Sequence, residues 1–175
     1  MSDVTVTHGA VPTFWGPAAP YCVDQSTPRT VSDSAAGETL VVLFSALTVD
    51  LEAPGKPLSD AAVAAFRAPL TGAPPDRTLT GFRVDVRGFA RTSEQARIVI
   101  YLVMGGVSLE IEFGFGVARG EAGDDADFFE SVDAPLPAGP LQTFSGLLVV
   151  QAERMDPDEV AVASIDSLEI TAVFA

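Results

Sequence analysis

Apolar and polar side chains alternate along much of the sequence from residue 80 onwards. A period of two is what a half-buried β-strand requires, because successive side chains point to opposite faces of the strand. Residues 80–89 and 107–115 alternate most regularly, and their apolar faces consist of Phe82, Val84, Val86, Val107, Leu109, Ile111, Phe113 and Phe115. The pattern predicts an all-β protein.

Further strands are expected on both sides of these segments. Residues 38–50 are apolar enough to predict a central strand buried on both faces. Gly105-Gly106 predicts a tight hairpin that joins a strand at 96–104 to the one at 107–115. The remaining predicted strands cover residues 141–153, 160–163 and 165–174. Regular short strands separated by turn residues favour an antiparallel, jelly-roll-like β-sandwich.

The alanine-rich segment from Leu58 to Leu70 fits two structures. Ser59 is a suitable N-cap for a short helix, with Asp60 in its first turn. Alanine favours that helix, whereas the neighbouring segments are all predicted strands. Helix and strand both remain open for this segment.

Residues 1–37 differ from the rest of the chain. Their prolines predict extended, irregular chain rather than sheet interior, apart from a short strand at Val4 and Val6. The sequence therefore predicts an N-terminal arm over 1–37 and a β-sandwich domain over 38–175. The large aromatics of the arm are Phe14, Trp15 and Tyr21. They are expected to pack either on the chain's own sandwich or on a neighbouring subunit, where they would be partner contacts.

The chain is strongly acidic, with a net charge of −14 and Lys56 as its only lysine. This charge disfavours nucleic acid and anionic membranes as partners, because both bind basic patches. The acids form either a solubilising coat or an anionic outer surface within a crowded assembly. Residues 1–8 lack a basic start and an apolar stretch, so no signal peptide is expected.

The acidic stretch Glu121–Glu130 is the best candidate for an ion site. Asp124, Asp125 and Asp127 offer the oxygen ligands that Ca²⁺ prefers. Their spacing does not match the EF-hand loop, so a plain solvated loop is the alternative. No other cofactor is expected.

No catalytic motif is found in the sequence. Glu110 and Glu112 share one strand face and resemble a glycosidase pair, although such residues more often form the wet face of a sheet. Cys22 and His8 are the only cysteine and histidine, which disfavours both zinc and a cysteine nucleophile. A buried apolar role suits Cys22 better. We therefore expect a protein that is not an enzyme.

Three segments resemble jelly-roll-type β-sandwich domains of bacteriophage virion proteins. These are the aromatic opening at 14–24, the strand and preceding turn at 77–88, and the final strand at 163–172. The resemblance implies a virion structural protein: a capsid- or tail-associated decoration, head-fibre, fibre-base or adaptor subunit. It would be located in the virion, contact other virion subunits and form a homo-oligomer. The alternative is a carbohydrate-binding module of a bacterial or phage adhesin, which would bind a glycan.

Overall fold

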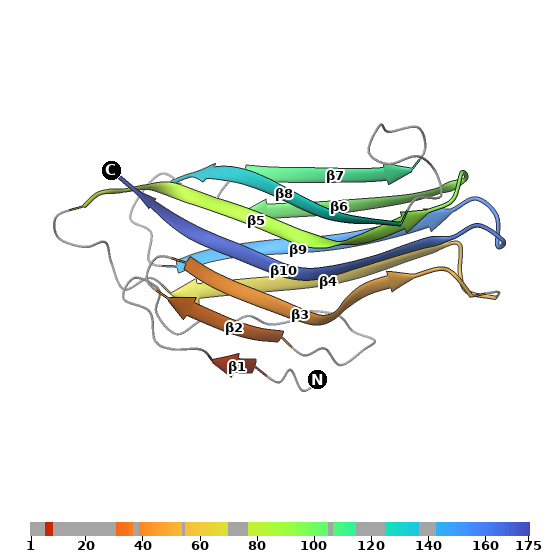
Figure 1. The fold of residues 1–175 in the computed structure, drawn as a ribbon, viewed down its shortest axis with the longest axis horizontal. Coiled ribbons are helices and arrows are strands. Elements are labelled where there is room, and N and C mark those ends of the chain that lie inside the picture. Colours follow the sequence, from red (N-terminus) through yellow and green to blue (C-terminus); the bar gives the residue numbers. More distant parts are fainter. Residues whose placement is uncertain are drawn as a thin grey trace.

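A computed structural model describes residues 6–8, 31–36, 39–53, 55–69, 77–104, 107–114, 125–136 and 143–175 of the chain. These residues form strands and loops and no helix (Figure 1). The strands are β1 (Val6–His8), β2 (Val31–Ala36), β3 (Thr39–Asp50), β4 (Ser59–Pro69), β5 (Leu79–Thr92), β6 (Ala96–Met104), β7 (Val107–Gly114), β8 (Asp125–Pro135), β9 (Thr143–Arg154) and β10 (Ala161–Phe174).

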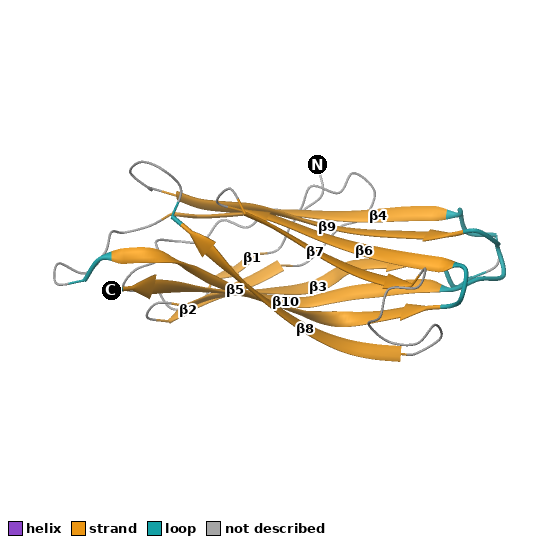
Figure 2. Ribbon diagram, turned by 90° about the horizontal axis from the view of Figure 1, so that it is seen from above, coloured by secondary structure: helices purple, strands orange, loops and turns teal. Residues whose placement is uncertain are grey.

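The strands form two sheets that pack face to face as a sandwich (Figure 2). The large sheet has the order β1-β2-β3-β10-β5-β8, and the small sheet has the order β4-β9-β6-β7. From β3 to β10 every connection except the β6–β7 hairpin crosses from one sheet to the other. This is the strand arrangement of a jelly roll, and the predicted fold class is confirmed. β1 is the exception to antiparallel pairing, because it pairs parallel with β2.

The core forms between the sheets from the alternating side chains. In β5 the buried residues Phe82, Val84 and Val86 face the small sheet, as predicted. Two aromatic contacts join the sheets: Phe82 lies 4.4 Å from Phe144 between ring centroids, and Phe113 lies 5.3 Å from Phe128. Because no disulfide is available with a single cysteine, burial of this apolar layer stabilises the fold.

The predicted hairpin and the open segment 58–70 both belong to the small sheet. The β6–β7 pairing extends to Met104 and Val107, which confirms the predicted hairpin, although Gly105-Gly106 itself lies outside the described residues. The open segment 58–70 contains a strand, β4. Its antiparallel pairing with β9 provides hydrogen bonds that outweigh the helix propensity of alanine.

The prediction that residues 38–50 are buried on both faces is wrong. Leu40 and Val42 face the core, whereas Leu43, the residue after Val42, is 49% exposed. The reason is the two-layer architecture: the small sheet covers only one face of the large sheet, so the other face remains at the surface.

The C-terminal strand is longer than predicted. Residues 160–163 and 165–174 were expected as separate strands, but Ala161–Phe174 forms one strand, β10, which pairs with both β3 and β5. A bulge between Ile165 and Ser167 interrupts its register with both neighbours. The extra residue reverses the alternation, so that Ile165 and Leu168 both face the core.

The acidic stretch also differs from the expected loop. Residues 125–135 form β8, an edge strand of the large sheet, so the loop prediction is wrong from Asp125 onwards. Phe128, Val132 and Ala134 pack toward the core. Within the predicted arm, Val6–His8 and Val31–Ala36 are strands of the large sheet, so the prediction of irregular chain is wrong for residues 31–36, where pairing with β3 fixes a strand. The division at residue 37 remains a prediction.

Candidate functional site

A shallow hollow of about 580 Å³ lies on the outer face of the large sheet. Its described lining residues come from β5, β8 and β10 and are Arg87, Gly88, Asp127, Phe128, Phe129 and Asp166. We call it the Phe129 hollow, because that side chain is 52% exposed. A phenyl ring this exposed is unusual, since large aromatics are normally buried in a core or an interface.

The bulge in β10 shapes the hollow. Asp166 is the unpaired residue between Ile165 and Ser167, and its side chain is exposed. Opposite the bulge lies Gly88, where a Cβ atom would be 2.2 Å from the Ser164 carbonyl oxygen and 2.7 Å from the Phe128 ring. Only glycine therefore allows β5 and β10 to approach so closely here. Bulges commonly redirect a side chain toward a surface site in this way.

The charges of the hollow have both signs. Arg87 is opposite Phe129 across the β5–β8 pair, and its guanidinium carbon lies 5.0 Å from the ring centroid. Its Nη2 atom is also 3.4 Å from a carboxylate oxygen of Glu169. Asp127 and Asp166 add exposed carboxylates. The hollow thus combines an apolar ring with hydrogen-bond donors and acceptors.

The outer face of the small sheet is different in character. Ala65, Leu147 and Val103 lie side by side across β4, β9 and β6, and Val63, Val149 and Tyr101 form the next row. Val103 is 47% exposed and Leu147 is 39% exposed. These residues make a continuous surface, here called the apolar face: Val63, Ala65, Tyr101, Val103, Leu147 and Val149.

Charged groups border the apolar face. Arg97 lies between two acids of the neighbouring strands, with Nε 2.5 Å from Glu112 and Nη1 3.3 Å from Glu153. Glu110 is exposed at the β7 edge. The glycosidase-like pair is therefore split, because Glu112 is in an ion pair with Arg97 while Glu110 faces water. This arrangement fits the wet sheet face that was the alternative.

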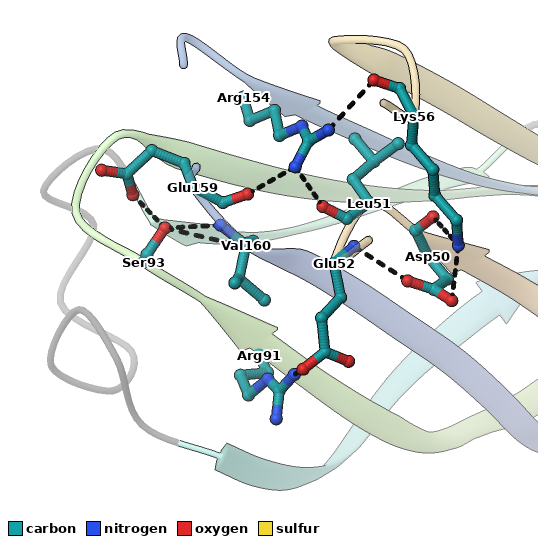
Figure 3. Close-up of polar contacts among 9 residues, drawn as sticks. All are labelled: Asp50, Leu51, Glu52, Lys56, Arg91, Ser93, Arg154, Glu159 and Val160. Atoms are coloured by element: carbon teal, nitrogen blue, oxygen red, sulfur yellow. Dashed lines mark hydrogen bonds and ion pairs between the residues drawn. The ribbon is translucent and has the colours of Figure 1, made fainter. Parts of the chain in front are cut away.

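A buried arginine holds the loops at one end of the sandwich (Figure 3). Arg154 is 3% exposed. Its Nη1 donates to the carbonyl oxygens of Leu51, Pro157 and Glu159 at 2.6, 2.7 and 2.8 Å, and its Nη2 donates to that of Lys56 at 3.0 Å. One guanidinium thus joins the β3–β4 loop to the β9–β10 loop. Its role is structural, because its guanidinium donates to backbone carbonyls of two loops.

The same end of the molecule contains further polar links. Ser93, just after β5, hydrogen-bonds the Glu159 carboxylate, and its hydroxyl accepts from the Val160 N–H at 2.8 Å. Arg91 is paired with Glu52 at 2.5 Å. Lys56 is 2.7 Å from Asp50, and this hydrogen bond, followed by one from the Glu52 N–H, lowers the pKa of Asp50 below its ordinary value.

The predicted calcium ligands do not share one described site. Asp125 is the first residue of β8, Asp127 lines the Phe129 hollow, and Asp124 lies outside the described residues. Within the described ranges, no three His, Cys, Asp or Glu side chains gather closely enough to hold a metal ion. Calcium binding by the three aspartates remains a prediction.

The predicted partner-contact residues Phe14, Trp15 and Tyr21 lie outside the described residues, as does Cys22. His8 is the last residue of β1. In the part of the chain that the structure describes, no helix is long and apolar enough to span a membrane.

The Phe129 hollow and Arg154 are absent from the sequence prediction. A signal for the hollow exists in the sequence: polar residues alternate with apolar ones at 163 and 165 and then at 168, 170 and 172, and this change of phase indicates a bulge near residue 166. For Arg154 no local signal exists, because the carbonyls it contacts come from residues as distant as Leu51.

No family model and no curated protein matches the chain. Among solved structures, it is similar to the carbohydrate-binding module TmCBM61 in complex with β-1,4-galactotriose, at 10% identity and a TM-score of 0.39, over 90% of this chain and 89% of that one. It is also similar to a Broad Bean Stain Virus structure (13% identity, TM-score 0.33, 87% and 92% covered). A bacteriophage CBA120 tailspike protein 4 domain matches at 10% identity and a TM-score of 0.26, over 94% of this chain and 18% of that one.

Proposed function

We propose that this chain is a non-enzymatic structural subunit of a virus particle, associated with a capsid or a tail as a decoration, fibre-base or adaptor protein. The observation that carries the structural role is the apolar face. Val103 and Leu147 are both substantially exposed at its centre, and a continuous apolar surface of this kind marks a protein interface. The virion setting is supported by the resemblance of segments 14–24, 77–88 and 163–172 to phage virion domains.

The apolar face suits self-association. A flat sheet face can pack against a second copy of itself around a two-fold axis, as most homo-oligomers do. The Arg97 ion pairs at its border supply polar groups of both signs at the rim of such an interface. Phe14, Trp15 and Tyr21 are proposed as additional anchors on a neighbouring subunit.

The test is the mass of the protein in solution, measured by light scattering. Wild type is expected to be oligomeric, and Val103→Asp and Leu147→Asp are each expected to shift it toward monomer because they bury a charge in the interface. Leu43→Asp is the matched control, since Leu43 is 49% exposed on the outer face of the large sheet. A monomeric wild type, or an oligomer that withstands both substitutions, overturns association through the apolar face.

The anchors need point substitutions rather than removal of residues 1–37. Such a deletion would also remove β2, which pairs with β3 along its whole length, and would leave a new sheet edge exposed. The combined Phe14→Ala, Trp15→Ala and Tyr21→Ala variant is expected to lose incorporation into particles while remaining folded. Unchanged incorporation would remove the anchor role.

A further inference from the structure

We infer that the Phe129 hollow is a binding site for a neutral oligosaccharide. This inference goes beyond the structural role and does not depend on it, because the hollow lies on the large sheet and the apolar face lies on the small one. A site formed by an exposed ring and a few surrounding polar groups is the usual composition of a small-molecule site.

The exposed ring provides the first half of the argument. Phe129 remains 52% exposed even though the Arg87 guanidinium lies over it. The C–H face of a pyranose ring is apolar and packs well on such a phenyl surface. Phe128, the next residue, faces the core and packs at 5.3 Å from Phe113, so the strand that presents Phe129 is anchored from behind.

The charges of the hollow decide the class of ligand. Asp127 and Asp166 would repel an anion, as would the net charge of −14. Arg87 adds guanidinium N–H donors, which a cation could not use. A sugar hydroxyl both donates and accepts, so a neutral oligosaccharide can donate to the carboxylates and accept from the guanidinium. A neutral oligosaccharide therefore matches the two carboxylates and the guanidinium at once.

The experiment uses the full-length protein and a panel of neutral trisaccharides: cellotriose, maltotriose and mannotriose. Sialyllactose and spermidine are the anionic and cationic probes, and their binding is compared with that of the neutral trisaccharides. Binding is followed by amide chemical shifts in NMR spectra and quantified by titration calorimetry. We expect at least one neutral trisaccharide to shift the amides of Phe129 and Asp166, and both charged probes to bind at least about tenfold more weakly.

Variants locate the site. Phe129→Ala is expected to weaken binding at least about tenfold, and Phe129→Tyr to restore it, because tyrosine keeps the ring. Asp166→Ala is expected to weaken binding by removing an acceptor. Val103→Ala on the small sheet is the control and should leave affinity unchanged. Amide spectra of each variant verify that the fold persists.

Three results would overturn the inference. The first is the absence of amide shifts in the hollow with every neutral trisaccharide. The second is binding that survives Phe129→Ala unchanged, which would place the sugar elsewhere. The third is tighter binding of sialyllactose or spermidine than of any neutral sugar, which would assign the hollow to a charged ligand.

Discussion

At the scale of single residues, Arg154 shows how a buried charge is satisfied without an acid. Its guanidinium carries donors in a fixed plane, and four carbonyl oxygens from two loops lie within hydrogen-bond distance of them. Burying a charge is unfavourable unless it is hydrogen-bonded. The surrounding carbonyls meet that need and bring the two loops together.

Replacing this arginine should therefore be costly. Arg154→Met removes the donors while keeping the apolar stem, and we expect the free energy of unfolding to fall by about 3 kcal/mol, because buried carbonyls lose their partners. Urea denaturation measures the change. Arg83→Met is the control. Arg83 is 58% exposed and its ion pair with Asp85 is long, at 3.5 Å, so we expect the free energy of unfolding to change by less than about 0.5 kcal/mol. Equal losses in the two variants would contradict this role.

Asp50 gives a pH-dependent prediction at the same scale. The hydrogen bond from Lys56 and then that from the Glu52 N–H lower its pKa below 3.8 in the folded state. A carboxyl with a lowered folded pKa stabilises the protein above its unfolded value and loses that contribution as the pH falls through the folded pKa. Asp50 is half exposed, so solvent screening keeps the contribution below about 1 kcal/mol.

The measurement compares wild type with Asp50→Asn by denaturation at several pH values. The variant should be slightly less stable at pH 7 and equal to wild type at pH values well below 3.8. Lys56→Gln should behave in the same way, because it removes the other member of the pair. A stability difference that does not change with pH would show that the ion pair is not its source.

At the scale of elements, the bulge in β10 matters most. Residues before it face the core at odd positions and residues after it face the core at even positions. A regular strand that kept Asp166 within the alternation would turn one of these halves inside out, because a shift of one residue exchanges the two faces. The same bulge places Asp166 at the Phe129 hollow, so core packing and the proposed site depend on one insertion.

Deletion of Asp166 should preserve cooperative folding, since it leaves a regular alternation in which Ile165, Leu168 and Ile170 all face the core. Asp166→Ala is the matched control, because it keeps the extra residue and changes only an exposed side chain; we expect its free energy of unfolding to stay within about 0.5 kcal/mol of wild type. Near-ultraviolet circular dichroism and urea denaturation follow the fold and the stability of both variants. Loss of cooperative unfolding in the deletion variant would show that the fold requires the bulge itself.

The edge strands β7 and β8 also explain part of the acidic composition. They end the small and large sheets on the same side of the sandwich (Figure 1). Both carry exposed acids, namely Glu110, Asp127 and Asp133. Like charges along an exposed edge hinder pairing with another chain. The acids therefore protect this side, which is consistent with the apolar face as the surface proposed for association.

At the scale of the whole molecule, two forces oppose each other. The apolar face favours association, whereas a net charge of −14 on each copy opposes it. Salt screens the repulsion and leaves the apolar contact intact. The two outer faces also differ: that of the small sheet is apolar, and that of the large sheet has the Phe129 hollow. A subunit with two such faces can contact its assembly through one and a ligand through the other.

Raising sodium chloride from about 0.05 M to about 0.5 M should strengthen self-association, because the Debye length becomes shorter than the distance between the charged surfaces. Sedimentation velocity at the two salt concentrations measures the change. The Leu147→Asp variant should remain monomeric at both. Association that weakens in salt would mean that ion pairs, such as those of Arg97, hold the subunits together instead of the apolar face.

Local sequence determined the existence and facing of most strands. In β5 and β7 the alternation of apolar and polar residues is regular, and the buried face is the predicted one. The reason is physical: the direction of a side chain along a strand depends only on its position in the chain. Strand β8 was missed because Phe129 on its outer face and Glu130 on its inner face both break the pattern.

Only the tertiary structure decided which strands became neighbours. β10 lies between β3 and β5, and β9 lies between β4 and β6, and these partners are far apart in the sequence. Their pairing depends on packing across the core, which no local pattern contains. The Phe129 hollow, the apolar face and the carbonyls around Arg154 all arise from that pairing, so the surfaces that could act on other molecules appeared only in three dimensions.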